Sequence, residues 1–223
     1  MSFLTCKPKV DPIDVLPGDP IELFWTTIAG HVGNMAVNMG FSHIRTVCMN
    51  TAKAAMKEMA NGGAEDDEAK GVSIVHKRYC KEGIMAAAKS LDFARREFIA
   101  SAEEMRAMAR FGVSAKDMER FFRLVAGTKD LDIERSKLHG ISRRPLEQME
   151  EALALAPGAS VASGTLYSLI NAVTYWNTYT RGTSATTADS RTMSLWTNTG
   201  RKSNDTAWKL ATAWMKNGNL QAV

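Results

Sequence analysis

Polar aromatic and amide side chains recur at four-residue intervals in the C-terminal quarter of the sequence, at Tyr167, Asn171, Tyr175 and Tyr179. On an α-helix this spacing places the four side chains on one side. Such a row can stack nucleic-acid bases on its rings, and each stacked base contributes about 1–3 kcal/mol. The same row can instead pack half-buried against a neighbouring helix and keep its hydroxyl groups wet. The row therefore admits a ligand-binding and a structural interpretation.

The positive charge of the chain is concentrated in the same region. From residue 164 to the end there are six basic and two acidic residues, and the resulting net charge of +4 equals that of the whole 223-residue chain. This segment also holds four of the five tryptophans. Aromatic residues interleaved with Arg and Lys are typical of a surface that binds single-stranded nucleic acid. The charge distribution therefore favours the ligand-binding interpretation of the row.

We expect the basic side chains of this surface to contact phosphates, its rings to stack on bases, and its amide to form a hydrogen bond. Arg45 precedes an expected helix N-terminus, which is a natural anion site, so this side chain can contact a phosphate. It can equally pair with an acidic residue. The predicted nucleic-acid-binding residues are Arg45, Asn171, Tyr175, Tyr179, Arg181, Arg191, Trp196, Arg201 and Lys202.

No pattern in the sequence favours catalysis. There is no G-x-S-x-G motif, and the glycines near basic residues lack the spacing of a phosphate-binding loop. His76 and Cys80 lie four residues apart, as two metal ligands on one helix face would, but no second pair of ligands accompanies them. We therefore predict no enzymatic activity, no metal site and no cofactor.

The elements expected to position these residues are mainly helical. IELFWTTIA (21–29) and MAVNMGFSHIRTVC (35–48) predict a β-hairpin because they are rich in β-branched and aromatic residues and are separated by glycines. Apolar residues at three- and four-residue spacing predict a long helix from 78 to 110. Further helices are expected over 114–127, 143–155, 164–180 and 190–198, and a last helix is expected to be capped by Ser203 or Asp205.

The sequence thus predicts a mainly helical α+β fold, in which a small antiparallel β-hairpin or sheet packs on a long helix beside a C-terminal helical cluster. Residues 1–20 are expected to form an extended N-terminal arm, and residues 21–223 a single domain. Within that domain, 21–60 hold the hairpin and a first helix, 72–158 the helical middle, and 163–223 the basic, aromatic-rich cluster. Since a lone hairpin is marginally stable, we expect either that it packs on the long helix or that further strands come from residues 1–20 or from a partner.

Three segments taken together resemble a known family: HIRTVCMNT (43–51), GTLYSLINAVTYW (164–176) and SRTMSLWTNTGRKSNDTAWKLA (190–211). Their order and spacing are similar to those of phage- and plasmid-encoded proteins that contain a domain of unknown function. The resemblance covers roughly residues 21–216. The chain departs from the family where an acidic residue and a His usually follow Asn-Ala-Val-Thr, because Tyr175, Trp176, Asn177 and Thr178 stand there instead.

The resemblance implies a mobile-element protein in the cytoplasm of a bacterial host, and such genes often lie among recombination and DNA-processing functions. We therefore expect a homo-oligomer that binds single-stranded DNA and assists recombination or annealing. The alternative is a non-enzymatic assembly module that binds a host or phage protein through the aromatic row. No apolar run of eighteen residues is present and the N-terminus lacks a signal-peptide pattern, so no membrane association is expected.

Overall fold

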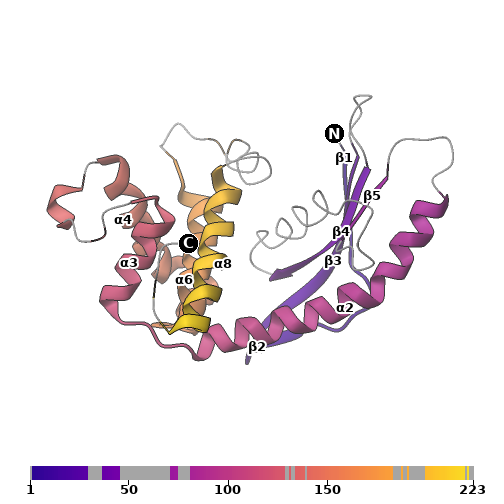
Figure 1. Ribbon diagram of the computed structural model, residues 1–223, viewed down its shortest axis with the longest axis horizontal. Helices are drawn as coiled ribbons and strands as arrows, with labels where there is room; N and C mark the ends of the chain where they lie inside the picture. Colours follow the sequence, from indigo (N-terminus) through magenta and orange to yellow (C-terminus); the bar gives the residue numbers. More distant parts are fainter. Residues whose placement is uncertain are drawn as a thin grey trace. The chain divides into compact units, whose positions relative to one another are not determined.

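The computed structural model describes residues 2–29, 37–45, 71–74, 81–128, 131, 134–138, 140–182, 187, 190, 199–218 and 220. Over these residues the fold is mainly helical α+β, as the sequence predicts (Figure 1). The chain divides into two compact units, residues 1–103 and 104–223. The sequence analysis expected one domain after residue 20, because no linker composition marks the boundary inside the long helix.

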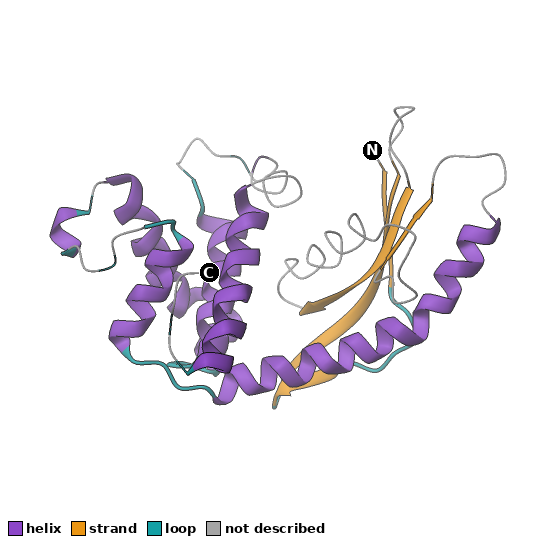
Figure 2. Cartoon of the chain, viewed as in Figure 1, coloured by secondary structure: helices purple, strands orange, loops and turns teal. Residues whose placement is uncertain are grey.

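The first unit contains a five-stranded antiparallel sheet, drawn in orange in Figure 2. Its strands are β1 (Ser2–Cys6), β2 (Ile13–Leu16), β3 (Asp19–Ala29), β4 (Val37–Arg45) and β5 (Gly71–Ile74). They lie in the order β1-β3-β4-β5, and β2 pairs with β3 as well. The predicted hairpin is confirmed as β3 and β4, whose register runs from Ile21 opposite Arg45 to Ile28 opposite Asn38.

The N-terminal residues belong to the sheet, where the sequence analysis expected an arm. β1 pairs with the second half of β3, and β2 pairs with its beginning. β3 is eleven residues long, so it has room for both short strands along the edge opposite β4. Pro17 and Gly18 connect β2 to β3, and Gly18 has a φ of 76°, which suits the third position of a type II turn. Residues 1–20 are thus one source of the additional strands.

Alternation along β3 explains which of its faces is buried. Asp19, Ile21 and Leu23 are buried together with Val15 of β2, in the two-residue period of a strand.

The unit also contains most of α2 (Lys81–Arg110), which confirms the predicted long helix. Phe98, Ala102, Met105 and Met108 form a buried stripe along α2 at helical spacing. The first helix expected before residue 60 lies outside the described residues.

The described part of the second unit is mainly helical. It begins with the last residues of α2, which are followed by α3 (Ala115–Val125), η1 (Arg135–Lys137), α4 (Gly140–Leu155) and α5 (Pro157–Val161). They are followed by α6 (Leu166–Tyr175), the π-helical turn η2 (Trp176–Thr180) and α8 (Thr199–Asn217). Every residue from Leu166 to Val173 is buried, because α6 contacts α3, α4, α5 and α8. α6 is therefore the central helix of this unit (Figure 1).

Three aromatic rings pack together within this helical unit. The ring of Trp214 on α8 lies 5.5 Å from Phe111, edge to face, and 6.4 Å from Phe121, in a stacked arrangement. The sequence analysis expected at least one of Trp208 and Trp214 in the core, and Trp214, which is 5% exposed, confirms this. The rings of Phe121 and Trp214 are therefore part of the core.

The predicted start of the last helix is wrong. α8 begins at Thr199, so Ser203 and Asp205 lie inside the helix and neither caps it. Ser203 is buried, and its hydroxyl accepts a hydrogen bond from Arg181, 22 residues earlier in the chain. The polar, basic composition of residues 199–206 suggested a loop. Nothing in that segment indicates that Ser203 is bonded to Arg181. The helix expected over 190–198 lies outside the described residues, apart from Ser190.

Candidate functional site

The row of polar aromatic side chains leads from the core to the surface. Tyr167 is 3% exposed, Asn171 is buried, Tyr175 is half-buried and Tyr179 is 48% exposed. The Asn171 side chain donates a hydrogen bond to the Tyr167 carbonyl at 2.9 Å, which satisfies its amide inside the helix. The row is thus neither wholly structural nor wholly a platform. The predicted role of Asn171 on a base does not fit its position in the core.

The end of the helix is a π turn, which shapes the surface part of the row. The Arg181 backbone N–H donates to the Trp176 carbonyl at 2.8 Å, a bond over five residues instead of four. After this turn the chain becomes extended at Arg181, with φ −59° and ψ 136°. Such turns occur frequently at functional sites. The turn brings Tyr179 and Arg181 out of the packed body of α6.

Tyr175 and Tyr179 form a ring pair at this end of the helix. Their ring centroids are 4.7 Å apart and the ring planes are inclined by 44°. Tyr175 is partly covered, so Tyr179 contributes most of the exposed aromatic surface of the pair. A base stacked here would lie against Tyr179, with Tyr175 behind it.

Arg181, two residues after Tyr179, packs on buried side chains. Its guanidinium carbon lies 4.9 Å from the ring centroid of Trp176, within the range of a cation–π contact. Its Nη1 donates to Asn177 Oδ1 at 2.8 Å and to Ser203 Oγ at 3.2 Å. We call the six residues that make up this arrangement the Arg181 cluster: Gln148, Trp176, Asn177, Arg181, Ser203 and Asn204.

The orientation of the Asn177 amide is set by α8. Asn177 is 1% exposed, and its Nδ2 donates to Asn204 Oδ1 at 2.6 Å. Its Oδ1 is thereby turned towards Arg181, which needs an acceptor. Asn177 and Asn204 therefore hold Nη1 of Arg181 in place without adding a negative charge.

Gln148 of α4 secures the other side of the platform. Its Oε1 accepts from Trp176 Nε1 at 2.9 Å, and its Nε2 donates to the Thr180 carbonyl at 3.0 Å. One side chain thus fixes the indole under Arg181 and the last carbonyl of η2. The cluster is built from three elements, α4, η2 and α8.

Arg181 is a partly desolvated cation whose described partners are neutral. Burial lowers its pKa from the ordinary value, although a guanidinium remains protonated at neutral pH. Within the described part of the chain it contacts no carboxylate; its polar partners are the two oxygens of Asn177 and Ser203. An anion at this position would gain from a charge that no described acid neutralises.

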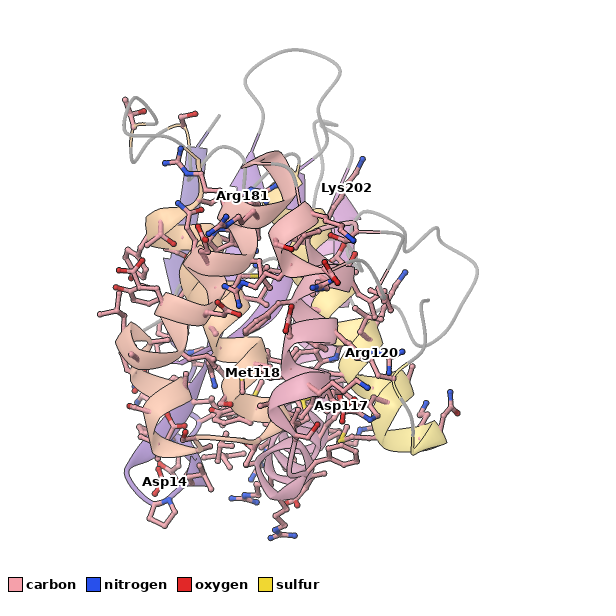
Figure 3. All side chains as sticks on the ribbon, turned by 90° about the vertical axis from the view of Figure 1, so that its left-hand side faces the viewer. Asp14, Asp117, Met118, Arg120, Arg181 and Lys202 are labelled. Atoms are coloured by element: carbon pink, nitrogen blue, oxygen red, sulfur yellow. The ribbon has the colours of Figure 1, made fainter. Side chains whose placement is uncertain are left out.

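Two further cations belong to elements that contribute to the Arg181 cluster. Lys202 precedes Ser203 on α8 and is exposed, and Figure 3 shows it at the same end of the helical unit as Arg181. Arg144 is exposed on α4, one turn before Gln148 and so on the same side of that helix. Among the residues described, neither Lys202 nor Arg144 has a carboxylate partner.

The remaining predicted residues are placed less fully. Arg45 ends β4 in the first unit, and Arg201 lies in the first turn of α8; only their backbones are described. Arg191 and Trp196 lie outside the described residues. From the predicted set the structure therefore brings together Tyr175 and Tyr179, whose rings are in contact, and it places Arg181 two residues later against Trp176, Asn177 and Ser203.

Sequence reasoning missed Arg144, Gln148, Asn177, Ser203 and Asn204 as members of the site. One signal was available: Asn177 lies four residues before Arg181, which is a helical contact spacing. Gln148 and Asn204 come from other helices, 28 and 27 residues from their partners. No local pattern marks such pairs.

The described residues contain no group of three or more His, Cys, Asp or Glu that could hold a metal ion. None of their helices combines the length and the apolar character needed to cross a membrane.

The fold and site define a mainly helical α+β protein with a half-buried arginine on an aromatic platform. The domain of unknown function DUF932 matches residues 2–208, so the chain belongs to this family. No curated protein and no solved structure shows a significant match to the chain.

Proposed function

We propose that this protein is a DNA-associated protein of a phage or plasmid. It binds single-stranded DNA in the cytoplasm of a bacterial host and assists recombination or annealing as a homo-oligomer. The bases stack on Tyr179 and its partner Tyr175, and the phosphates contact Arg181 and Lys202. Arg191, Trp196 and Arg201 contribute further contacts, and Arg45 makes a separate phosphate contact on the first unit.

The observation that carries this proposal is the presence of a half-buried Arg181 two residues after the exposed ring of Tyr179. Arg181 contacts no carboxylate among the described residues, and Tyr179 is 48% exposed. Single-strand binding surfaces combine such rings with cations that follow the backbone. The excess of positive charge in the C-terminal quarter of the sequence supports the same assignment.

Fluorescence anisotropy with labelled single- and double-stranded oligonucleotides tests the proposal, at about 50 and 200 mM salt. We expect binding to single strands that weakens steeply between the two salt concentrations, because bound phosphates release counterions. Tyr179→Ala should weaken binding roughly fivefold to a hundredfold, the equivalent of about 1–3 kcal/mol for one stacked base.

Tyr167→Phe is the matched control, since it alters a buried tyrosine of the same row. Its affinity for DNA should equal that of the unaltered protein. Absence of binding at micromolar protein and low salt would contradict the proposal.

A protein-binding module is the second candidate, and one observation favours it. Leu155 and Val161, at the end of α4 and of α5, are 49% and 55% exposed, and exposed apolar side chains of this size suit a protein partner. On this alternative the chain assembles with a host or phage protein. Light scattering should then show that the molecular mass of the assembly falls when Leu155 is replaced by Glu.

A further inference from the structure

The hydrogen bonds of Arg181 leave one edge of its guanidinium unassigned. Nη1 carries two hydrogens, and its two described acceptors, Asn177 Oδ1 and Ser203 Oγ, account for both. The Nε–H and the two hydrogens of Nη2 have no partner among the described residues. Nε and Nη2 form one side of the planar fork, the geometry that binds a phosphate or carboxylate through two parallel bonds.

Arg181 is also held more firmly than an ordinary surface arginine. The Trp176 ring supports one face of the guanidinium, and the Asn177–Asn204 pair fixes the acceptor for Nη1. Trp176 is in turn fixed by Gln148. An arginine that is already ordered loses less conformational entropy when it binds a ligand, so more of the interaction energy appears as affinity.

The charge of Arg181 indicates the ligand class, because the two cations of α4 are balanced by Glu147, Glu150 and Glu151 on the same helix. Arg144, Arg181 and Lys202 come from α4, the end of η2 and α8, and within the described residues none of them contacts a carboxylate. Asp205 on α8 lies three residues beyond Lys202 and has a partner elsewhere in the structure. A guanidinium that contacts no carboxylate among the described residues suits an anion with several oxygens and a full negative charge, as in a phosphate group.

We propose that the Nε/Nη2 edge of Arg181 is a preorganised seat for one phosphate group, with Asn177, Ser203 and Asn204 as positioning residues. The inference deepens the proposed function, because a phosphodiester of single-stranded DNA is the expected source of that phosphate. Lys202, at the same end of the helical unit in Figure 3, supplies further positive charge.

NMR of the arginine Nε–Hε groups tests the seat directly in the intact chain. The Arg181 signal is identified by its loss in Arg181→Lys. Addition of oligothymidylate of about twelve nucleotides, within the usual site size of about 4–16, should shift this signal in a saturable manner. Inorganic phosphate is the second probe, and it separates a seat for any phosphate from one that requires DNA.

Two variants link the seat to DNA affinity. Arg181→Lys keeps the charge and removes the fork, so affinity should fall about tenfold while the salt dependence changes little. Asn177→Asp places a carboxylate against Nη1, so affinity should fall and the slope of log affinity against log salt should decrease by about 0.7, the value of one phosphate contact on a single strand.

Asn217→Asp is the matched control for the added charge. Asn217 is exposed at the far end of α8, 14 residues beyond Ser203, which is about 21 Å along a helix. This distance exceeds the Debye length of about 8 Å at physiological salt, so affinity should be unchanged. Circular dichroism checks that each variant is folded. The NMR titration uses the unaltered protein, so it tests the proposal even if the Asn177→Asp variant does not fold.

The outcomes separate the seat from the proposed function. DNA binding with an unmoved Arg181 signal and full affinity in Arg181→Lys would overturn the seat and leave the function standing. A saturable shift with inorganic phosphate but no DNA binding would support the seat and overturn the function. An unmoved signal with both probes and no DNA binding would overturn both.

Discussion

Gln148 is the residue on which the support of the candidate site depends most. It accepts from the Trp176 indole and donates to the Thr180 carbonyl, and both partners belong to η2. Gln148→Met removes both hydrogen bonds and leaves the two partner groups without them. We expect a loss of about 1–3 kcal/mol in the free energy of unfolding, measured by urea denaturation, because unpaired buried polar groups are costly.

Glu151→Met is the control for this change, because Glu151 is exposed on the same helix. The free energy of unfolding should change by no more than about 0.5 kcal/mol. Equal stability of the Gln148→Met variant and the unaltered protein would show that the two hydrogen bonds contribute nothing.

At the scale of elements, α3 shows how a short sequence encodes a whole helix. Ser114 accepts from the Asp117 N–H at 3.1 Å at the start. At the end, the Gly127 N–H donates to Leu124 and the Thr128 N–H to Arg123. These two bonds form a Schellman motif, in which Gly127 adopts a φ of 81°.

Two glycines with open surroundings separate backbone strain from crowding. An added Cβ would meet nothing within 4 Å at either Gly127 or Gly112, but only Gly127 has a positive φ. Gly127→Ala should destabilise the protein by about 1–2 kcal/mol, since L-residues resist this conformation. Gly112→Ala should stabilise it by about 0.4–1 kcal/mol, because it restricts only the unfolded chain. Thermal denaturation would contradict these two predictions if the melting temperatures of both variants changed in the same direction.

A helix or strand can be predicted from the sequence when the residues that determine it lie within it or at its ends. α3 is predictable because Ser114, Asp117 and Gly127 all lie at its ends. α6 is predictable as well, since its apolar residues recur at helical spacing. The Pro17-Gly18 turn was a local signal for β2 that the sequence analysis did not use. The start of α8 is different, because Ser203 is buried against Arg181, which local composition does not show.

The same distinction applies to the candidate site. Tyr175, Tyr179 and Arg181 are close in sequence, so spacing and charge suffice to select them. Asn171 was selected by the same spacing, yet it is buried because α6 is surrounded by other helices. Gln148 and Asn204 enter the site only when α4 and α8 pack beside η2. Tertiary packing therefore determines which members of a periodic row face a ligand.

At the scale of the whole molecule, the two compact units should unfold separately. The first unit contains a single tryptophan, Trp25, so Trp25→Phe leaves tryptophans in the second unit alone. Tryptophan fluorescence of this variant then reports on the helical unit, while far-UV circular dichroism reports on both units. We expect the two urea transitions not to coincide, because each unit has its own core.

Leu169→Ala in the same background assigns the transitions. Leu169 is fully buried in α6, so its truncation should destabilise the helical unit by about 2–5 kcal/mol and move the fluorescence transition to lower urea. The part of the dichroism change that belongs to the first unit should stay in place. Coincident transitions that move together would show that the chain unfolds as one cooperative body.

The π turn of η2 has a consequence for insertions and deletions. A turn closed over five residues is equivalent to an α-helix that has accommodated one additional residue. The additional residue is absorbed within η2, because the Arg181 N–H still bonds to the Trp176 carbonyl and closes the turn. A chain shortened by one position between Asn177 and Thr180 would close the same bond over four residues, so Arg181 would keep its direction. The same loss inside α6 would rotate every later side chain by about 100°. Loss of a single codon should therefore be tolerated in η2 and disruptive in α6.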